Sequence, residues 1–412
     1  MLMLNAGPAR RDPLYHPMFA SRTNWSLTPN PLATALEERR AAGKEILDLT
    51  ESNPTRCGFD YDQPAILHAL AQPAALRYEP EPRGLPLARE AVADYYRDSA
   101  AKSGVAGSLP SAEQIVLTAS TSEAYSFVLR LLCEPGDEVL VPAPSYPLLE
   151  YLAALQDVKL VHYPLLYDHG WQMDLAALEA ALTARSRAVV VVHPNNPTGS
   201  FVTPAESEAL TRLCAQHSLA LIADEVFLDF AQDGLVRPSF VHGDGALIFA
   251  LSGLSKLCGL PQLKVGWIAT SGPPALVRQA LGRLELIADT YLSVNTPAQL
   301  ALPELLAHRH RFQRQMMSRI SRNRRELDQQ LDSIPECRRL EAQGGWYAVI
   351  RIPAVRSDEE FCLRLLREQG VLAHPGHFFD FPGEGHLVTS LILPSPDYAE
   401  GIRRVVKVAK RS

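Results

Sequence analysis

The chain has 412 residues, of which 47% are hydrophobic and 21% charged, and its formal net charge is −6. This composition is typical of globular proteins, and the negative charge gives no general attraction to nucleic acid or to an anionic membrane. Because the length exceeds what one compact core usually supports, we expect two domains or one large α/β domain with an addition.

Cysteine usage argues against a metal centre and against a disulfide scaffold. The six cysteines include no pair at the Cys-x-x-Cys spacing of zinc sites, so we expect no metal and a reducing, cytoplasmic location. The start, Met1–Leu4, lacks the features of a secretory signal, and no apolar run approaches the ~20 residues of a membrane span. We therefore expect no membrane segment.

The predicted elements begin with an N-terminal arm, residues 1–30, followed by a helix at 31–42 and a short strand at 46–49. From residue 115 onward, strands alternate with helices. The predicted strands are 115–118, 138–142, 159–163, 188–193, 219–223, 247–251 and 265–269. Helices are predicted at 122–133, 175–183 and 204–217.

This alternation favours a three-layer α/β/α domain. Continuous apolar runs such as Ala188–Val192 are typical of strands buried on both faces of a mainly parallel sheet. Helices between such strands give right-handed βαβ units. We therefore predict a large domain over residues 46–296.

The pattern changes after residue 296. One long helical stretch is predicted from 297 to about 333, then a strand, a helix, a strand and a last helix, at 346–352, 358–369, 387–392 and from 397. These features favour a smaller α+β domain, made of residues 31–45 and 297–412. Seven arginines between Arg309 and Arg325 could form a nucleic-acid surface. Phe312, Met316 and Ile320 recur at helical spacing among them, so a solvated helix face is the preferred interpretation.

Three polar side chains follow apolar strands, where open α/β sheets bind ligands. Asn196 follows the strand at 188–193, Asp224 follows the strand at 219–223, and Lys256 follows the strand at 247–251. Each alone could be a turn or a helix cap. Together, an amide, a carboxylate and a lysine in a small-residue turn suit a lysine that forms a Schiff base.

The order and spacing of these segments resemble the fold-type-I, pyridoxal-phosphate-dependent class I/II aminotransferases, of which aspartate aminotransferase is a member. The resemblance runs from about residue 46 to 402. Other segments that carry it are Arg77–Gly84, Thr118–Ala124, Pro142–Tyr146, Gly344–Tyr347 and His374–Gly376. It implies PLP fold type I and PLP as the cofactor.

The resemblance also implies roles for individual residues. Lys256 would form the Schiff base and move the substrate proton, and Asp224 would keep the pyridine nitrogen protonated. Asn196 would donate to the ring oxygen, and Tyr146 would stack on the ring. The phosphate would be held by Ser120, Thr121, Ser122, Ser255 and Lys264.

In this family Tyr78 would reach the phosphate of a neighbouring subunit, which implies a homodimer with shared active sites. Simpler interpretations stay open: Tyr146 as a core residue, Ser120–Ser122 as an ordinary helix cap, and Tyr78 as a surface residue.

Three positions depart from the family pattern. Phe227 stands where a tyrosine is usual, Lys264 replaces a phosphate-binding arginine, and Val388 occupies the place of the arginine that binds the substrate carboxylate. No arginine occurs between Arg367 and Arg403, so another group must bind the substrate carboxylate.

Candidates for binding the substrate lie in two loops: Ser52, Asn53 and Arg56 in one, and His377 in the other. For Arg56, a solvated loop arginine is the alternative.

The predicted function is transfer of an amino group from an amino acid to a 2-oxo acid by a ping-pong mechanism. Because PLP also supports elimination, decarboxylation and racemisation, a lyase, decarboxylase or other non-transaminase enzyme is one alternative. A catalytically silent PLP-binding homologue is the other, and the retained Lys256, Asp224 and Asn196 argue against it.

Overall fold

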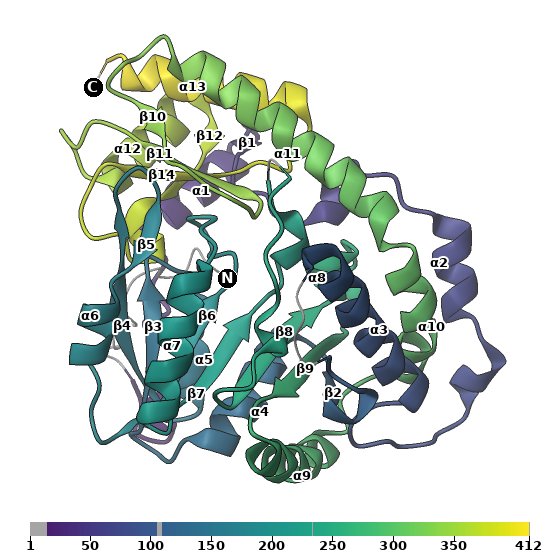
Figure 1. Cartoon of the computed structure of the whole chain (residues 1–412). Coiled ribbons are helices and arrows are strands. Elements are labelled where there is room, and N and C mark those ends of the chain that lie inside the picture. Colours follow the sequence, from purple (N-terminus) through teal and green to yellow (C-terminus); the bar gives the residue numbers. More distant parts are fainter. Residues whose placement is uncertain (1–14, 105–108, 233, 412) are drawn as a thin grey trace.

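The computed structural model describes residues 15–104, 109–232 and 234–411 (Figure 1). Nearly half of the predicted arm, residues 1–14, lies outside the described residues. The rest of it runs along α5 (Leu148–Leu155), where Trp25 packs edge-on against Tyr151 with ring centroids 5.3 Å apart.

An eight-stranded sheet forms the centre of the molecule. Its strand order is β2-β9-β8-β7-β6-β3-β4-β5. The strands are β2 (Ile115–Thr118), β3 (Glu138–Ala143), β4 (Lys159–Tyr167), β5 (Trp171–Met173), β6 (Ser186–Val192), β7 (Ala220–Asp224), β8 (Ile248–Gly253) and β9 (Gly266–Ser271).

The sheet is mainly parallel, as predicted. β8, β7, β6, β3 and β4 pair in parallel, whereas β9 is antiparallel to both of its neighbours and β5 is antiparallel to β4. Every residue of β8 is buried, which explains why its sequence is apolar without alternation.

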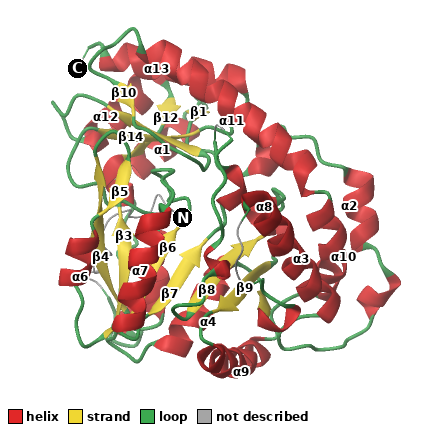
Figure 2. Cartoon of the chain, viewed as in Figure 1, coloured by secondary structure: helices red, strands yellow, loops and turns green. Residues whose placement is uncertain are grey.

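Helices cover both faces of this sheet, which confirms the three-layer prediction (Figures 1 and 2). Val190 of β6 packs with α4 and α9 on one face, and its neighbours Val189 and Val191 pack with α6 and α7 on the other. The helices of these layers are α2 (Gln63–Leu70), α3 (Pro86–Ser103), α4 (Thr121–Leu132), α6 (Leu175–Ala180), α7 (Pro204–Gln216), α8 (Leu254–Leu257) and α9 (Pro274–Tyr291).

A second, antiparallel sheet lies toward the C-terminal end of the chain, in the order β10-β11-β14-β13. Its strands are β10 (Arg338–Arg339), β11 (Tyr347–Arg351), β14 (His386–Ser390) and β13 (His374–Pro375). Helices α1 (Pro31–Ala41), α12 (Asp358–Arg364) and α13 (Ser395–Ala409) pack beside it. The N-terminal strand β1 (Leu47–Asp48) pairs in parallel with β12 (Val371–Leu372).

The predicted long helix after residue 297 is two helices, α10 (Thr296–Ala307) and α11 (Arg309–Leu331). α10 packs in the core of the large sheet with Ala301 and Leu302, whereas Phe312 and Met316 of α11 pack in the core of the small sheet. The chain turns at His308, so that α10 packs in one core and α11 in the other. Figure 1 shows α11 running diagonally from one region to the other.

The arginines of α11 do more than cover a solvated face. Arg309 is buried and donates to the Leu306 carbonyl oxygen (2.7 Å) and to Asp98 (3.1 Å). Arg319 donates to the carbonyl oxygens of Cys57 and Ile392. The remaining exposed arginines fit the predicted solvated face: Arg311, Arg314, Arg322 and Arg325. Among the described helices, none is both long and apolar enough to cross a bilayer.

Candidate active site

Asn196, Asp224 and Lys256 meet at one edge of the large sheet. Asp224 is the last residue of β7, in register with Val192 of β6 and Leu251 of β8. Asn196 and Lys256 follow β6 and β8, the two neighbours of β7 in the sheet. All three line a cavity of about 470 Å³, in the size range of small-molecule sites. The structure therefore brings the three polar residues at the strand ends together, as the sequence predicted.

Asp224 is held by two donors. The Tyr125 hydroxyl donates to Oδ2 (3.1 Å) and the Val226 N–H donates to Oδ1 (3.2 Å). Burial nevertheless raises the pKa of Asp224 to about 6, against these hydrogen bonds and the attraction of Lys256. A cation placed next to this carboxyl would stabilise its ionised form.

The Lys256 amine lies against aromatic rings, with Nζ 5.0 Å from the centroid of the Trp346 ring and 5.6 Å from that of Phe227. Burial lowers the pKa of Lys256 to about 8, although Asp224 opposes the shift. A larger fraction of the amine is therefore unprotonated near neutral pH than for an exposed lysine. The unprotonated amine is the form that attacks a carbonyl carbon.

The cavity ends at the N-terminus of α4, where Ser120 is the cap and its Oγ accepts from the Glu123 N–H (3.2 Å). Thr121 and Ser122, in the first turn, and Ser255 and Lys264 line the cavity here. A Cβ on Gly266 would lie 2.9 Å from the Ser120 carbonyl carbon, so only glycine lets β9 approach this turn so closely. A helix N-terminus with a lysine beside it attracts anions.

Hydrogen bonds to two other segments of the chain hold the turn that carries Asn196. The Asn195 side chain donates to the Pro144 carbonyl oxygen and to Thr198 Oγ1, both at 2.9 Å, which ties it to the loop that carries Tyr146. Gly199 accepts from the N–H groups of Gln343 and Gly344, both at 2.9 Å. Asn196 is buried, and its Oδ1 has no partner among the described residues.

The small sheet and the N-terminal segment form the opposite wall of the cavity. Tyr347 of β11 hydrogen-bonds to Ser52, and both line the cavity. Thr50, His374 and Phe379 complete this wall. Ser52 is thus brought to the cavity, as predicted from the sequence.

Four predicted residues are not among those that line the cavity. Arg56 is 74% exposed and pairs with Glu51 at 3.7 Å, and Asn53 Oδ1 accepts from the Thr55 N–H. His377 packs against Phe378, with ring centroids 4.9 Å apart. Tyr78 is exposed and borders a separate hollow with Leu292. Their roles stay predictions.

Sequence reasoning missed Tyr125 and His374. Tyr125 lies four residues after Thr121 and therefore on the same face of α4, a spacing that could have identified it. His374 begins a segment that carries the family resemblance, but its two-residue strand has no periodic pattern, so the sequence assigned no role to its side chain.

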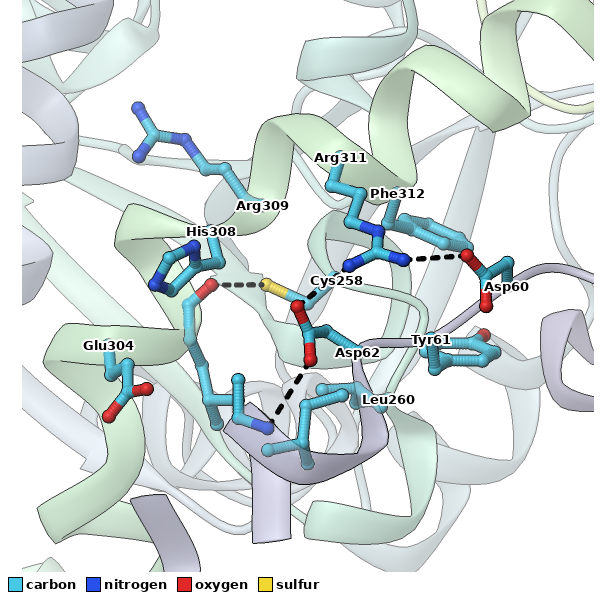
Figure 3. Close-up of a pocket in the computed structure, with 13 residues that line it drawn as sticks. Asp60, Tyr61, Asp62, Cys258, Leu260, Glu304, His308, Arg309, Arg311 and Phe312 are labelled. Carbon is cyan, nitrogen blue, oxygen red and sulfur yellow. Dashed lines mark hydrogen bonds and ion pairs between the residues drawn. The ribbon is translucent and has the colours of Figure 1, made fainter. Parts of the chain in front are cut away.

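A second, much smaller pocket of about 60 Å³ lies between α11 and the loop at residues 60–62 (Figure 3). Arg311 points between Asp60 and Asp62 and pairs with both, at 2.6 and 2.7 Å. These ion pairs tie the loop to the helix. The volume is far below that of a cofactor site.

Comparison with known proteins identifies the family. The sequence profile of the family described as aminotransferase class I and II matches residues 44–392. The chain belongs to this family. Class I/II aminotransferases are PLP-dependent enzymes of fold type I that act on amino acids and oxo acids, so the predicted fold class, cofactor and reaction type are confirmed.

Its relatives include a glutamate-pyruvate aminotransferase, AlaA, of Haemophilus influenzae, 27% identical over 86% of this chain and 87% of that protein. An alanine aminotransferase of Mycobacterium bovis is 30% identical over 89% of this chain and 86% of that protein. Among solved structures, an alanine aminotransferase from Pyrococcus furiosus superposes with a TM-score of 0.83, at 25% identity, covering 92% of this chain and 96% of that one.

The cavity of this class I/II aminotransferase has the donor set that PLP needs. Lys256 offers an amine for the aldehyde, Asp224 a carboxyl for the ring nitrogen, and the first turn of α4 an anion site for the phosphate. Asn196 lines the same cavity, and its side-chain NH₂ group could donate to the ring oxygen. The residues present therefore fit the cofactor.

Proposed function

We propose that Lys256 and Asp224 are the catalytic residues of this aminotransferase. The meeting of Lys256, Asp224 and Asn196 at the ends of three neighbouring strands carries the proposal. When bound, PLP supplies an electron sink for the electrons left when the substrate Cα proton is removed. The chain must then hold the ring, keep its nitrogen protonated and move the proton.

Each of these tasks falls to a residue of the cavity wall. Asp224 holds a proton at the ring nitrogen, and Tyr125 and Val226 fix the direction of its carboxyl group. Lys256 Nζ would accept the proton from the substrate Cα and deliver it to the carbon on the far side of the substrate nitrogen. Asn196 and Tyr146 orient the ring, and Ser120, Thr121, Ser122, Ser255 and Lys264 anchor the phosphate.

The two half-reactions share this one cavity, which gives ping-pong kinetics. We propose alanine and pyruvate as the first donor and acceptor to be tested, because the names of relatives include them. Mixing with the amino donor alone should convert the bound cofactor once and then stop. Continued turnover without an acceptor would favour a lyase instead.

The central experiment maps the covalent link. Borohydride treatment of the PLP-loaded protein should fix the cofactor on the peptide that contains Lys256, as read by mass spectrometry. Lys256→Ala should abolish this label and the half-reaction, whereas the exposed Lys159→Ala should leave both unchanged. A label on another lysine would overturn the assignment.

We also propose a homodimer in which Tyr78 reaches the partner's phosphate site. Tyr78 is 78% exposed and lies outside the cavity of its own chain. It borders a surface hollow with Leu292, and Leu76 beside it is 92% exposed. Large apolar side chains that are exposed close to one another are typical of an interface between subunits.

A cytoplasmic location completes the proposal. All six cysteines are free, and most are buried. Free cysteines without disulfides are usual in a reducing compartment.

A further inference from the structure

The substrates of an aminotransferase carry a carboxylate, and the cavity has few groups to bind it. Among the described residues that line the cavity, the cations are Lys256 and Lys264, and none is an arginine. Lys256 faces Asp224, and Lys264 lies at the anion site of α4. The opposite wall, from the small sheet and the N-terminal segment, must then supply the carboxylate site.

Among the described residues that line the cavity, His374 is the one histidine. It lies on β13 directly across from Val388 of β14, and side chains of directly opposed residues project to the same face of a sheet. Val388 is fully buried and cannot bind an anion. His374 therefore stands beside the position at which the sequence lacks the expected arginine.

The environment of His374 leaves it ready for a ligand. Its side chain is 6% exposed, and its ring lies 5.8 and 5.7 Å from the rings of Phe378 and Phe379. Its Nδ1 is buried, out of contact with the open part of the cavity, and has no partner among the described residues. A buried polar atom without a partner is unfavourable, so no hydrogen bond at Nδ1 holds the imidazole in this orientation, and a turned ring can offer a nitrogen to a ligand in the cavity.

Burial alone lowers the pKa of His374 to about 4, and no charged group contributes to the shift. The titratable groups that line the same cavity are Tyr125, Tyr146, Asp224, Lys256, Lys264 and Tyr347. A carboxylate next to the imidazole would favour the protonated ring and strengthen the contact.

We propose that His374 is the substrate-carboxylate residue of this enzyme and takes the place of the arginine absent at position 388. The proposal rests on the proposed function, because it needs the reacting amino acid to be held at Lys256. The substrate class that follows is an amino acid with a free α-carboxylate, in preference to its carboxamide or the parent amine.

The test compares an amino acid with its carboxamide, using the PLP-loaded enzyme. The amino acid with the fastest half-reaction among the twenty standard ones is chosen by the absorbance change of the bound cofactor. The wild type should prefer the acid to the carboxamide by about tenfold or more in kcat/KM. A wild-type ratio near one would overturn the proposal without any variant.

His374→Phe should raise KM for the acid by about tenfold, change kcat much less, and leave KM for the carboxamide nearly unchanged. His374→Asn keeps an N–H donor and should recover part of the preference. If His374→Phe fails to fold, the acid-to-carboxamide ratio of His374→Asn alone tests the proposal. The exposed His68→Asn is the control and should match the wild type.

An acid-to-carboxamide ratio that stays at the wild-type value in both His374 variants would overturn the proposal. Borohydride labelling of the same preparations separates the two ideas. With Lys256 labelled and the ratio unchanged, only the assignment of His374 fails. With no label on Lys256, or no half-reaction with any of the twenty amino acids, the proposed function fails and this inference with it.

Discussion

At the scale of single residues, burial sets the properties that the chemistry needs. Loss of contact with water raises the pKa of Asp224 to about 6 and lowers the pKa of Lys256 to about 8, so the two pKa values approach each other. Near neutral pH, small changes in their surroundings therefore alter their charge. The aromatic neighbours of Lys256 offer a place to make such a change.

Phe227 is the neighbour to alter. It lines the cavity with its ring 5.6 Å from Lys256 Nζ. In Phe227→Tyr, a new hydroxyl can donate to the ring oxygen of the bound cofactor and favour the deprotonated form of its link to Lys256. The midpoint of the pH-dependent change in visible absorbance should fall by about one pH unit. The exposed Phe19→Tyr should not move it, and an unmoved midpoint in Phe227→Tyr would discredit this role.

Lys264 carries a second prediction. Its ammonium is a point charge, without the two parallel bonds that a guanidinium makes to phosphate. Lys264→Ala should raise the dissociation constant of PLP by about tenfold, and Lys264→Arg should restore the affinity or improve it. Lys264 has a positive φ of 55°, and alanine bears the same backbone cost there as lysine. Equal affinity in Lys264→Ala, measured by equilibrium dialysis, would remove Lys264 from the phosphate site.

At the scale of elements, the turn after β6 depends on a glycine. Gly199 has φ +68°, and a Cβ there would collide with the Gly344 carbonyl oxygen and lie 2.8 Å from Ala342 Cβ. Because residues 342–345 lead into β11, this contact joins the Asn196 turn to the small sheet.

Gly199→Ala should therefore lower the free energy of unfolding by about 2 kcal/mol or more and weaken PLP binding as Asn196 moves. Gly43→Ala is a matched control, because Gly43 has φ +63° and nothing within 4 Å of its missing Cβ. It should cost only about 1 kcal/mol, for the left-handed backbone alone. Thermal melting would measure both variants, and equal losses would argue against the packing explanation.

The sequence predicted those parts of the site that follow apolar strands. Asn196, Asp224 and Lys256 could be placed at one edge because the carboxyl ends of parallel strands meet there. It could not predict that His374 and Val388 are in register, because short strands have no period to read. Nor could it predict the break at His308, since the helical pattern of apolar residues continues through it.

At the scale of the whole molecule, the exposed apolar side chains at Leu76, Tyr78 and Leu292 predict subunit contact. Leu76→Asp should shift the protein from dimer toward monomer in sedimentation velocity, because a charge buried in an apolar interface is costly. Leu166→Asp is the control, since Leu166 is 53% exposed on β4, at the other end of the sheet from β2. A wild-type monomer, or an unchanged dimer in Leu76→Asp, would contradict this prediction.

The pairing of β1 with β12 has a consequence for synthesis in the cell. Leu47 and Asp48 leave the ribosome more than 300 residues before their partners Val371 and Leu372. The strands of the large sheet can associate while translation continues, whereas β1 must wait for the residues of β12. Until then the residues of β12, α12 and α13 that pack with the apolar side of α1 are also missing, so this side stays exposed on the growing chain.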